Sequence, residues 1–343
     1  MCYALVALLP VPPKNQFKQG TKALEDQQNI NREVLRRCFE IIFRRLEDAF
    51  HNGVVMRCPD GYQRLCFPRI CSWIADYFEN VNLHSIKSGF CAVCEEHPDT
   101  FGTFQSRQPV FRDYKEYFER LIDSTDASLN LTTQAEALSS LKRAGVRTTE
   151  GVFWALNCIT LPTAITPDIL HTIYLGLLDH LMKWIVAFLN HHKRLNRFNQ
   201  IWQLVPAYPS LLRFNKAYTS VTQWQGKEMR ALGRILLPVF AATLWAPSTP
   251  ERPIFKEAIL CVKALIYFHL MAQYRSHTNE TLDYMQGYLR DFHQHKSVFN
   301  RFRASKSSKV IAAALRKQLM TDAREEREAE HNWKNLSGIA KHH

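Results

Sequence analysis

The chain has 343 residues, of which 46% are hydrophobic and 12% aromatic, a composition that excludes a disordered or fibrous protein. Lys and Arg number 44 against 32 Asp and Glu, so the formal net charge is +12. This excess favours a polyanionic partner, with nucleic acid as the first candidate and an acidic membrane surface as the second. A basic protein without such a partner is the alternative interpretation.

The N-terminus and the cysteines bear on the compartment. Residues 1–9 lack a basic region, and prolines follow where a cleavage site would need small residues, so no signal peptide is expected. The most apolar later stretch, Ile254–Met271, is interrupted by three charged residues, and we expect no membrane span. Nine cysteines do not suggest a disulfide framework. The sequence therefore predicts an intracellular protein with reduced thiols.

The first part of the chain combines short strands with one amphipathic helix. Tyr3–Leu9 is an apolar run that predicts a buried strand. Glu33–Phe50 has the apolar spacing of an amphipathic helix. Val54–Arg57 and Gln63–Phe67 flank a Pro-Asp-Gly turn and predict a hairpin. Ile70–Tyr77 fits either a short helix or a strand.

Helical periodicity dominates the chain after about residue 113. The second of the expected helices opens with a Thr-Thr capping signal, and the fourth contains Pro238, where we expect a kink. The expected helices are Tyr114–Ile122, Thr132–Ala144, Asp168–Asn190, Gly226–Ala242, Ile254–Tyr274, Thr281–His295 and a charged helix around Arg324–Glu328. The fold class predicted is therefore mixed α/β and predominantly helical.

Cys91 and Cys94 have the spacing of a zinc knuckle, which lets both sulfurs reach one tetrahedral ion. Such a site needs two more ligands, and His97 and His171 are the candidates. Two ordinary buried or half-buried thiols are the alternative. His171 follows Pro167 and Asp168 at the start of a predicted helix, so it can equally be a packing residue.

Two carboxylates are candidates for catalysis. Asp76 lies fifteen residues before Cys91, and its oxygen ligands would suit Mg²⁺ or Mn²⁺, whereas the paired sulfurs suit Zn²⁺. Many strands end in Asp, so Asp76 alone is a weak signal. Glu228 lies in the first turn of a predicted helix, where a glutamate that only favours the helix dipole is the alternative.

A basic tract lies between Asp291 and Asp322, with no acidic residue inside it and two phenylalanines among its cations. Such a tract can neutralise phosphates and release counterions. A solvated basic tail is the alternative. Its cations are Lys296, Arg301, Arg303, Lys306, Lys309, Arg316 and Lys317.

Six segments in this order resemble fungal CACTA-type transposases of the Plavaka group, and the resemblance covers most of the chain. It implies DNA as partner, no membrane, the nucleus as location, and a partial ribonuclease-H-like core interrupted by a large all-α insertion. Whether the chain forms a homo-oligomer stays open. The segments are Cys58–Pro68, Ile74–Glu79, Lys87–Cys94, Pro167–His171, Gln223–Glu228 with the following Leu236–Pro238, and Asp291–Lys296.

The resemblance also implies a domain division and a site. The segments would be the partial core with hairpin and knuckle (1–110), a helical insertion (111–222), helices returning to the core (223–300) and a basic, charged tail (301–343). Such transposases hold two divalent ions with three carboxylates, which activate water and then a 3′-hydroxyl for attack on a phosphodiester. Asp76 matches the second acid. Glu228 is the best match for the third, with Asp179 as the fallback.

Cys91, Cys94 and His171 match the zinc-type signature of such transposases. The family's first acid belongs to a strand upstream of the segment like Tyr3–Leu9, and this chain starts too late to contain it. We therefore expect an N-terminally truncated, inactive, transposase-derived DNA-binding protein. A domesticated zinc- and DNA-binding module without catalysis is the alternative, and an active nuclease would need the missing acid from another chain.

Overall fold

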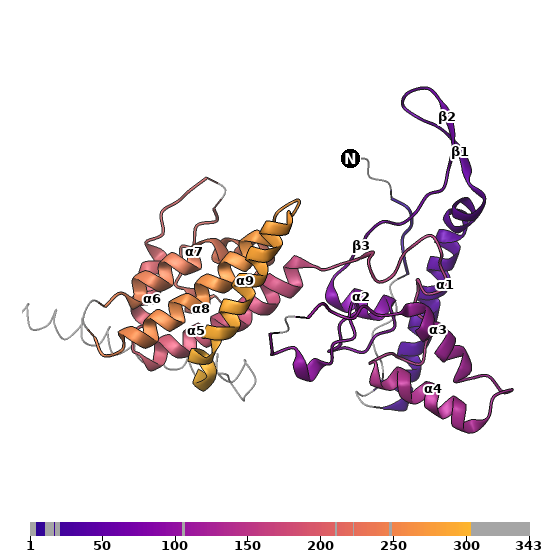
Figure 1. The fold of residues 1–343 in the computed structure, drawn as a ribbon. Coiled ribbons are helices and arrows are strands. Elements are labelled where there is room, and N and C mark those ends of the chain that lie inside the picture. The colour runs from indigo at the N-terminus through magenta and orange to yellow at the C-terminus, as the bar shows by residue number, and fades with distance from the viewer. Residues whose placement is uncertain are drawn as a thin grey trace, which may run out of the picture. The chain divides into compact units, whose positions relative to one another are not determined.

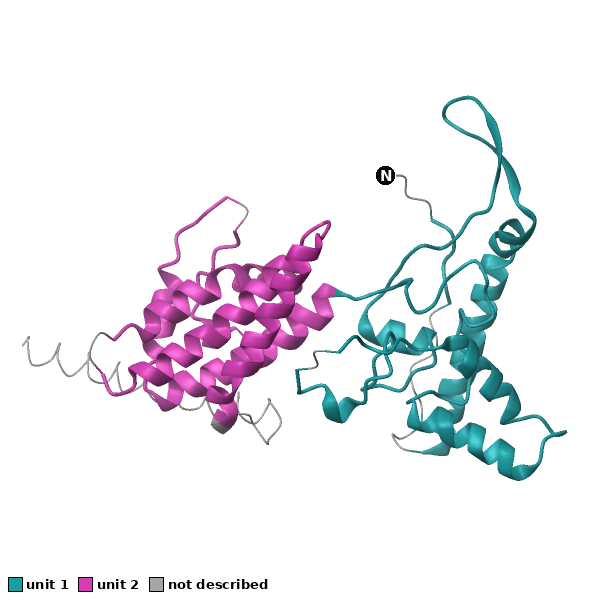
Figure 2. Cartoon of the chain, viewed as in Figure 1, with its two compact units in different colours: residues 1–168 teal, residues 169–343 magenta. Residues whose placement is uncertain are grey.

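The computed structural model describes residues 5–10, 17, 21–104, 107–209, 211–221, 223–246 and 249–302. The chain forms two compact units, unit 1 (residues 1–168) and unit 2 (residues 169–343), shown in Figure 2. This division does not test the four segments expected from the sequence. The last of them, 301–343, lies almost wholly outside the described residues.

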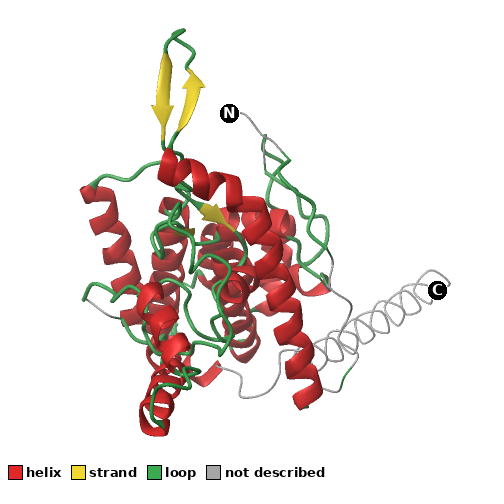
Figure 3. Cartoon of the chain, turned by 90° about the vertical axis from the view of Figure 1, so that its right-hand side faces the viewer, coloured by secondary structure: helices red, strands yellow, loops and turns green. Residues whose placement is uncertain are grey.

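Helices dominate both units, and the strands are few and short (Figures 1 and 3), as predicted for the fold class. The described strands form two sheets of two strands each. β1 (Val54–Arg57) and β2 (Gln63–Cys66) make the predicted antiparallel hairpin, with Gly61 at φ 87° in its turn. β3 (Trp73–Ile74) pairs in parallel with β4 (Ile165–Thr166), a strand that sequence reasoning missed.

The strand predicted over Tyr3–Leu9 is wrong in its described part. Residues 5–10 have no regular structure, and Leu5, Val6 and Leu8 are exposed. A strand needs a neighbour to pair its backbone amides and carbonyls. An apolar run alone supplies no such neighbour.

Unit 1 is built on the long helix α1 (Lys22–Asn52), which contains the predicted helix but begins earlier than Glu33. It begins after Thr21, whose hydroxyl accepts the backbone N–H of Leu24. It ends at Gly53, whose φ of 75° lies in a region that side chains disfavour. The local caps, rather than the apolar pattern, set both ends.

The buried face of α1 centres on Phe39. Its ring lies 5.6 Å from those of Trp73 and Phe153, which belong to later parts of unit 1. Val34 and Ile41 belong to the apolar spacing of this helix, but both are exposed. Aromatic contacts therefore decide which side of the helix is covered.

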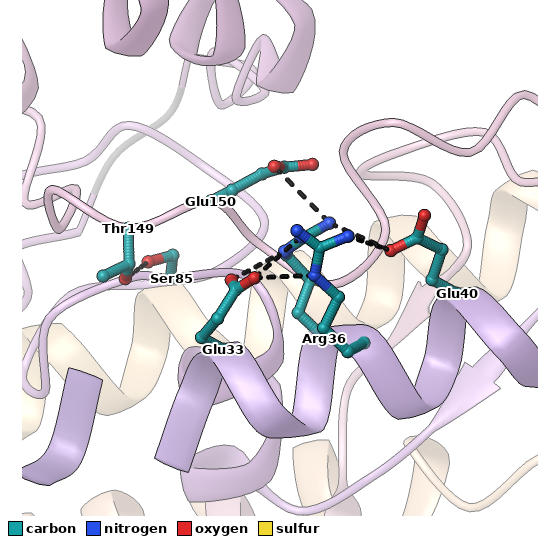
Figure 4. Close-up of polar contacts among 7 residues, drawn as sticks. Glu33, Arg36, Glu40, Ser85, Thr149 and Glu150 are labelled. Atoms are coloured by element: carbon teal, nitrogen blue, oxygen red, sulfur yellow. Dashed lines mark hydrogen bonds and ion pairs between the residues drawn. The ribbon is translucent and has the colours of Figure 1, made fainter. Parts of the chain in front are cut away.

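A cluster of charges also fixes α1. Arg36 donates to Glu33 at 2.9 Å and lies 3.6 Å from Glu40 on the same helix and from Glu150 on a later loop (Figure 4). The hydrogen bond with Arg36 is the largest cause that lowers the pKa of Glu33 to about 2. The cluster ties α1 to the segment around residue 150.

Near its C-terminal end, α1 holds a second loop through Glu47. The Glu47 carboxylate accepts the backbone N–H groups of Asn157 (2.9 Å) and Cys158 (3.0 Å). Burial acts to raise the pKa of Glu47, but these hydrogen bonds together outweigh it and lower that pKa to about 2. Two polar anchors and one aromatic cluster thus join α1 to the chain more than 100 residues later.

The other helices of unit 1 are α2 (Tyr77–Leu83), the short 3₁₀ turn η1 (Pro98–Thr100), α3 (Tyr114–Asp123) and α4 (Leu131–Arg143). The last two confirm predicted helices. The cap of α4 is Asn130, not the predicted threonines. Buried apolar residues of these helices, of β4 and of the connecting loops form one cluster, which comprises Val81, Ile86, Ala92, Tyr114, Tyr117, Leu141, Val146, Trp154 and Ile165.

Unit 2 is a bundle of helices around one apolar core (Figure 1). The helices predicted around Asp168–Asn190, Gly226–Ala242, Ile254–Tyr274 and Thr281–His295 are confirmed with small shifts, and α6 was not predicted. The elements are the π-helix η2 (Leu170–Leu178), α5 (Asp179–His191), α6 (Leu195–Gln203), the 3₁₀ turn η3 (Tyr218–Ser220), α7 (Gly226–Leu244), α8 (Arg252–Met271), α9 (Asn279–His295) and the 3₁₀ helix η4 (Lys296–Phe302). Pro238 lies inside α7.

In the described part of the chain, the helical stretch Leu170–His191 meets the length and hydropathy criteria for crossing a membrane. Of its most apolar window, 44% is buried inside the protein. A core helix of a globular protein passes the same test, so this stretch is weak evidence of a membrane span. From the sequence we identified Ile254–Met271 as the most apolar stretch and predicted no membrane span.

Candidate functional site

The predicted Cys pair lies in a turn whose backbone amides point at the sulfurs. The N–H of Val93 donates to Cys91 Sγ at 3.3 Å, and the N–H of Glu96 bonds to the Cys94 thiol. Burial raises the pKa of Cys94, and its neighbour Cys91 adds to that rise while the Glu96 amide opposes it. Amide donors stabilise negative sulfur, but the raised pKa of Cys94 favours its neutral thiol, so the turn holds two adjacent thiols that a bound cation would help to ionise.

A buried arginine holds this turn in place. Arg112 is 2% exposed and donates from Nε to the carbonyl of Cys91 at 2.6 Å and from a terminal nitrogen to the carbonyl of Ala144 at 2.8 Å. Its backbone N–H donates to Val93 at 3.1 Å. The turn is therefore a rigid part of unit 1.

Of the two candidate histidines, His97 belongs to unit 1, as the Cys pair does, and His171 belongs to unit 2. His97 caps η1, where its Nδ1 accepts the N–H of Asp99 at 3.4 Å, and its ring lies 5.7 Å from that of Phe90. His171 is exposed in η2 of unit 2. No group of three or more His, Cys, Asp or Glu among the described residues is arranged to hold a metal ion. The full zinc ligand set stays a prediction.

Both candidate catalytic acids cap helices. Asp76 Oδ1 accepts the N–H of Glu79 at 2.7 Å at the start of α2. Glu228 Oε2 accepts the N–H of Gln225 at 2.8 Å in the capping box of α7. Such carboxylates satisfy the free amides of a helix start. Asp76 belongs to unit 1 and Glu228 to unit 2.

The fallback acid and the basic tract lie in unit 2. Asp179 forms an ion pair with Lys183 at 2.6 Å. Of the predicted DNA-binding cations, Lys296 is described, and its Nζ lies 2.8 Å from His293 Nδ1. For Arg301 only the backbone is described. Arg303, Lys306 and Lys309 lie outside the described residues.

Sequence reasoning missed a basic pocket in unit 1. It has a volume of about 440 Å³, and its lining includes Arg32, Lys87, Lys142 and Arg147. Arg32 and Lys87 lie far in the sequence from Lys142 and Arg147, and the four residues belong to no single basic run. No sequence signal would have joined them, because only the fold brings the start of α1 beside the end of α4.

The known families provide the identification. A sequence model described as Plavaka transposase matches residues 1–185, more than half of the 343 residues. The chain belongs to the Plavaka transposase family. Comparisons with curated proteins and with solved structures give no match.

The Plavaka match covers unit 1 and the beginning of unit 2. It contains Asp76, the Cys91–Cys94 turn and His171, whereas Glu228 and the basic tract lie beyond it. Membership in the Plavaka transposase family implies DNA as the general partner. The basic pocket lies wholly inside the matched part.

Proposed function

We propose that this protein binds DNA and is an inactive remnant of a metal-dependent DNA strand-cleavage and strand-transfer enzyme. The observation that carries the proposal is membership in a transposase family, since a transposase must hold DNA to act on it. The net charge of +12 supports it independently, because phosphate neutralisation drives binding without regard to sequence. The proposal also includes a CACTA-type, fungal origin, a ribonuclease-H-like core and a nuclear location. These parts rest on the family resemblance.

The hydrogen bonding of the candidate acids supports the proposal that the protein is inactive. Two-metal catalysis needs carboxylates that converge on a shared pair of ions. Asp76 and Glu228 each accept a backbone amide of their own helix start, and they belong to different units. Each carboxylate is thus engaged as a helix cap in its own unit, and neither unit by itself shows a pair of acids converging on a shared ion among the described residues.

A domesticated zinc- and DNA-binding module without catalysis is the second candidate function. It is favoured by the turn that places the Cys91 and Cys94 thiols together, each with a backbone amide donor. Those two residues would hold a structural Zn²⁺, with His97 and His171 as the proposed further ligands. The ion would fix local structure and take no part in chemistry.

Binding and cleavage can be tested together on the full chain. We expect a labelled DNA duplex to bind with a dissociation constant on the order of 10⁻⁶ to 10⁻⁴ M at physiological salt, weakening steeply as salt rises. With Mn²⁺ added, we expect no cut strands. Fluorescence anisotropy measures the first quantity and gel electrophoresis the second.

Variants of Asp76 separate the two roles of its carboxylate. Asn is as good a helix cap as Asp, so Asp76→Asn removes the acid and preserves the start of α2, whereas Asp76→Ala removes both. If the wild-type protein cleaves DNA under Mn²⁺ and both variants abolish this cleavage, the protein is an active enzyme. Absence of DNA binding even at low salt would refute the proposed function.

For zinc, we expect the purified chain to contain about one equivalent per molecule, and Cys91→Ser to remove most of it. Cys71→Ser is the matched control, because Cys71 is an exposed thiol of the same unit and should leave the zinc content unchanged. Elemental analysis of both variants provides the measurement. A zinc content well below one equivalent that Cys91→Ser does not alter would rule out the knuckle.

A further inference from the structure

The basic pocket of unit 1 is lined by two separate parts of the fold. The first turns of α1 supply Gln28, Asn29 and Arg32 on one side. The turn after α2 supplies Lys87, and the end of α4 with the residues after it supplies cations on the other side. The volume of about 440 Å³ lies in the range of pockets that hold small ligands.

The backbone around the pocket is well supported. The N–H of Arg147 donates to Ser85 O at 2.8 Å, and the N–H of Lys87 donates to Gly145 O at 2.7 Å, so two loops run side by side. The hydroxyls of Ser85 and Thr149 lie 2.8 Å apart and join the same loops (Figure 4). The loops thus hold Lys87 and Arg147 in fixed positions at the pocket.

Much of the hydrogen-bonding capacity of the two arginines is unused by the described protein. Arg147 donates from Nε to Ile86 O at 3.1 Å, and Arg32 donates from one terminal nitrogen to Asn29 Oδ1 at 2.8 Å. A guanidinium carries five N–H donors in a planar fork. Several donors on each side chain therefore remain available to a ligand in the pocket.

The charges in the pocket are unbalanced. Among the described residues, no ion pair joins its four cations to a carboxylate, and Glu25 is the one acidic residue in the lining. Burial, followed by the charge of Arg147, lowers the pKa of Arg32 to about 10. Burial also lowers the pKa of Arg147. Like charges held together in a half-buried site are relieved by a bound anion.

We propose that this pocket binds a phosphate group, held by the guanidinium groups of Arg32 and Arg147 and the ammonium groups of Lys87 and Lys142. Planar guanidinium groups match two phosphate oxygens at once, and lysines add point charges. The phosphate of a DNA backbone and that of a free nucleotide share this chemistry. A DNA source rests on the proposed function, whereas phosphate binding by itself does not.

Pyrophosphate is the probe for the pocket, titrated calorimetrically into the full chain. Loss of a charged hydrogen bond predicts that Arg147→Gln weakens binding about tenfold or more. Lys142→Gln removes an exposed ammonium group that makes no hydrogen bond within the described part of the chain, and it should weaken binding a few-fold without affecting the fold. Glu25→Gln removes the opposing charge and should strengthen binding.

Arg57→Gln is the matched control, because Arg57 is an exposed cation on the hairpin of the same unit. It makes the same change in net charge as Arg147→Gln and should leave pyrophosphate binding unchanged. Equal effects of Arg57→Gln and Lys142→Gln would overturn the proposal in favour of general charge. So would wild-type protein that does not bind pyrophosphate.

DNA-binding measurements distinguish a DNA backbone from a free phosphate compound as the ligand of the pocket. If it is the DNA backbone, Lys142→Gln and Arg147→Gln reduce the slope of log affinity against log salt by about 1, and pyrophosphate competes with the duplex. If the variants change pyrophosphate binding and not DNA binding, the ligand is a free phosphate compound. If the wild type binds pyrophosphate and no DNA, the proposed function fails while the pocket stands.

Discussion

Replacing Arg112 by alanine is expected to lower the free energy of unfolding of unit 1 by about 3 kcal/mol. The side chain is 2% exposed and bridges the carbonyls of Cys91 and Ala144. Without it, both half-buried carbonyls lose a charged donor and a cavity opens. The substitution also removes a buried charge, one of whose terminal nitrogens has no hydrogen-bond partner among the described residues. This gain limits the loss of stability.

The local consequence of Arg112→Ala is a looser Cys turn. We expect Cys91 and Cys94 to react faster with a thiol reagent in the variant, and urea unfolding to measure the change in stability. Arg120→Ala is the control, because Arg120 forms a surface ion pair with Glu116 and should change stability by about 0.5 kcal/mol or less. Equal stability of the Arg112 and Arg120 variants would contradict the structural role of the buried arginine.

Replacing Trp202 by alanine is expected to destabilise unit 2 by about 4 kcal/mol. Trp202 is fully buried, and its ring centre lies between 4.6 and 6.2 Å from four other aromatic rings. Three of them, on Phe214, Tyr218 and Trp224, belong to the segment between α6 and α7, which contains the 3₁₀ turn η3. Removal of the indole therefore opens a large cavity and releases that segment from the bundle.

Trp245→Ala is the control for Trp202→Ala, because it removes the same side chain at a position that is 70% exposed. We expect it to change stability by about 0.5 kcal/mol or less. Trp202→Phe keeps part of the packing and should fall between the two. Urea denaturation followed by near-ultraviolet circular dichroism compares the three, and comparable losses at both tryptophans would refute the assigned packing.

Local chemistry explains where sequence reasoning succeeded in the fold. The hairpin follows from Pro59-Asp60-Gly61, since the glycine takes a positive φ that other residues resist. The helices of unit 2 follow from long apolar spacing. The same reasoning missed α6, whose nine residues give a short pattern, and β4, whose two residues pair with a strand about ninety positions earlier. An apolar run does not show which strand it will pair with or which residue will cap a helix.

In the candidate site, too, the local features could be predicted from the sequence and the roles of other residues could not. The spacing of Cys91 and Cys94 is local, and the structure brings the two thiols into one turn as expected. The sequence offered a helix-dipole glutamate as the alternative at Glu228 and a chance strand-end Asp as the alternative at Asp76, and the structure shows a helix cap at both positions. Whether either also serves in catalysis stays a prediction.

The amino-acid sequence by itself determined the family, the helical character, the hairpin, the Cys turn and the basic charge, because each depends on residues close together in the chain or on composition. Only the tertiary structure decided which face of α1 is buried, which loops Glu47 and Arg36 hold, and that Arg32, Lys87, Lys142 and Arg147 share one pocket. The physical reason is that burial and charge repulsion depend on distances in space. Residues that lie more than a hundred positions apart, as Arg32 and Arg147 do, meet only once the chain has folded.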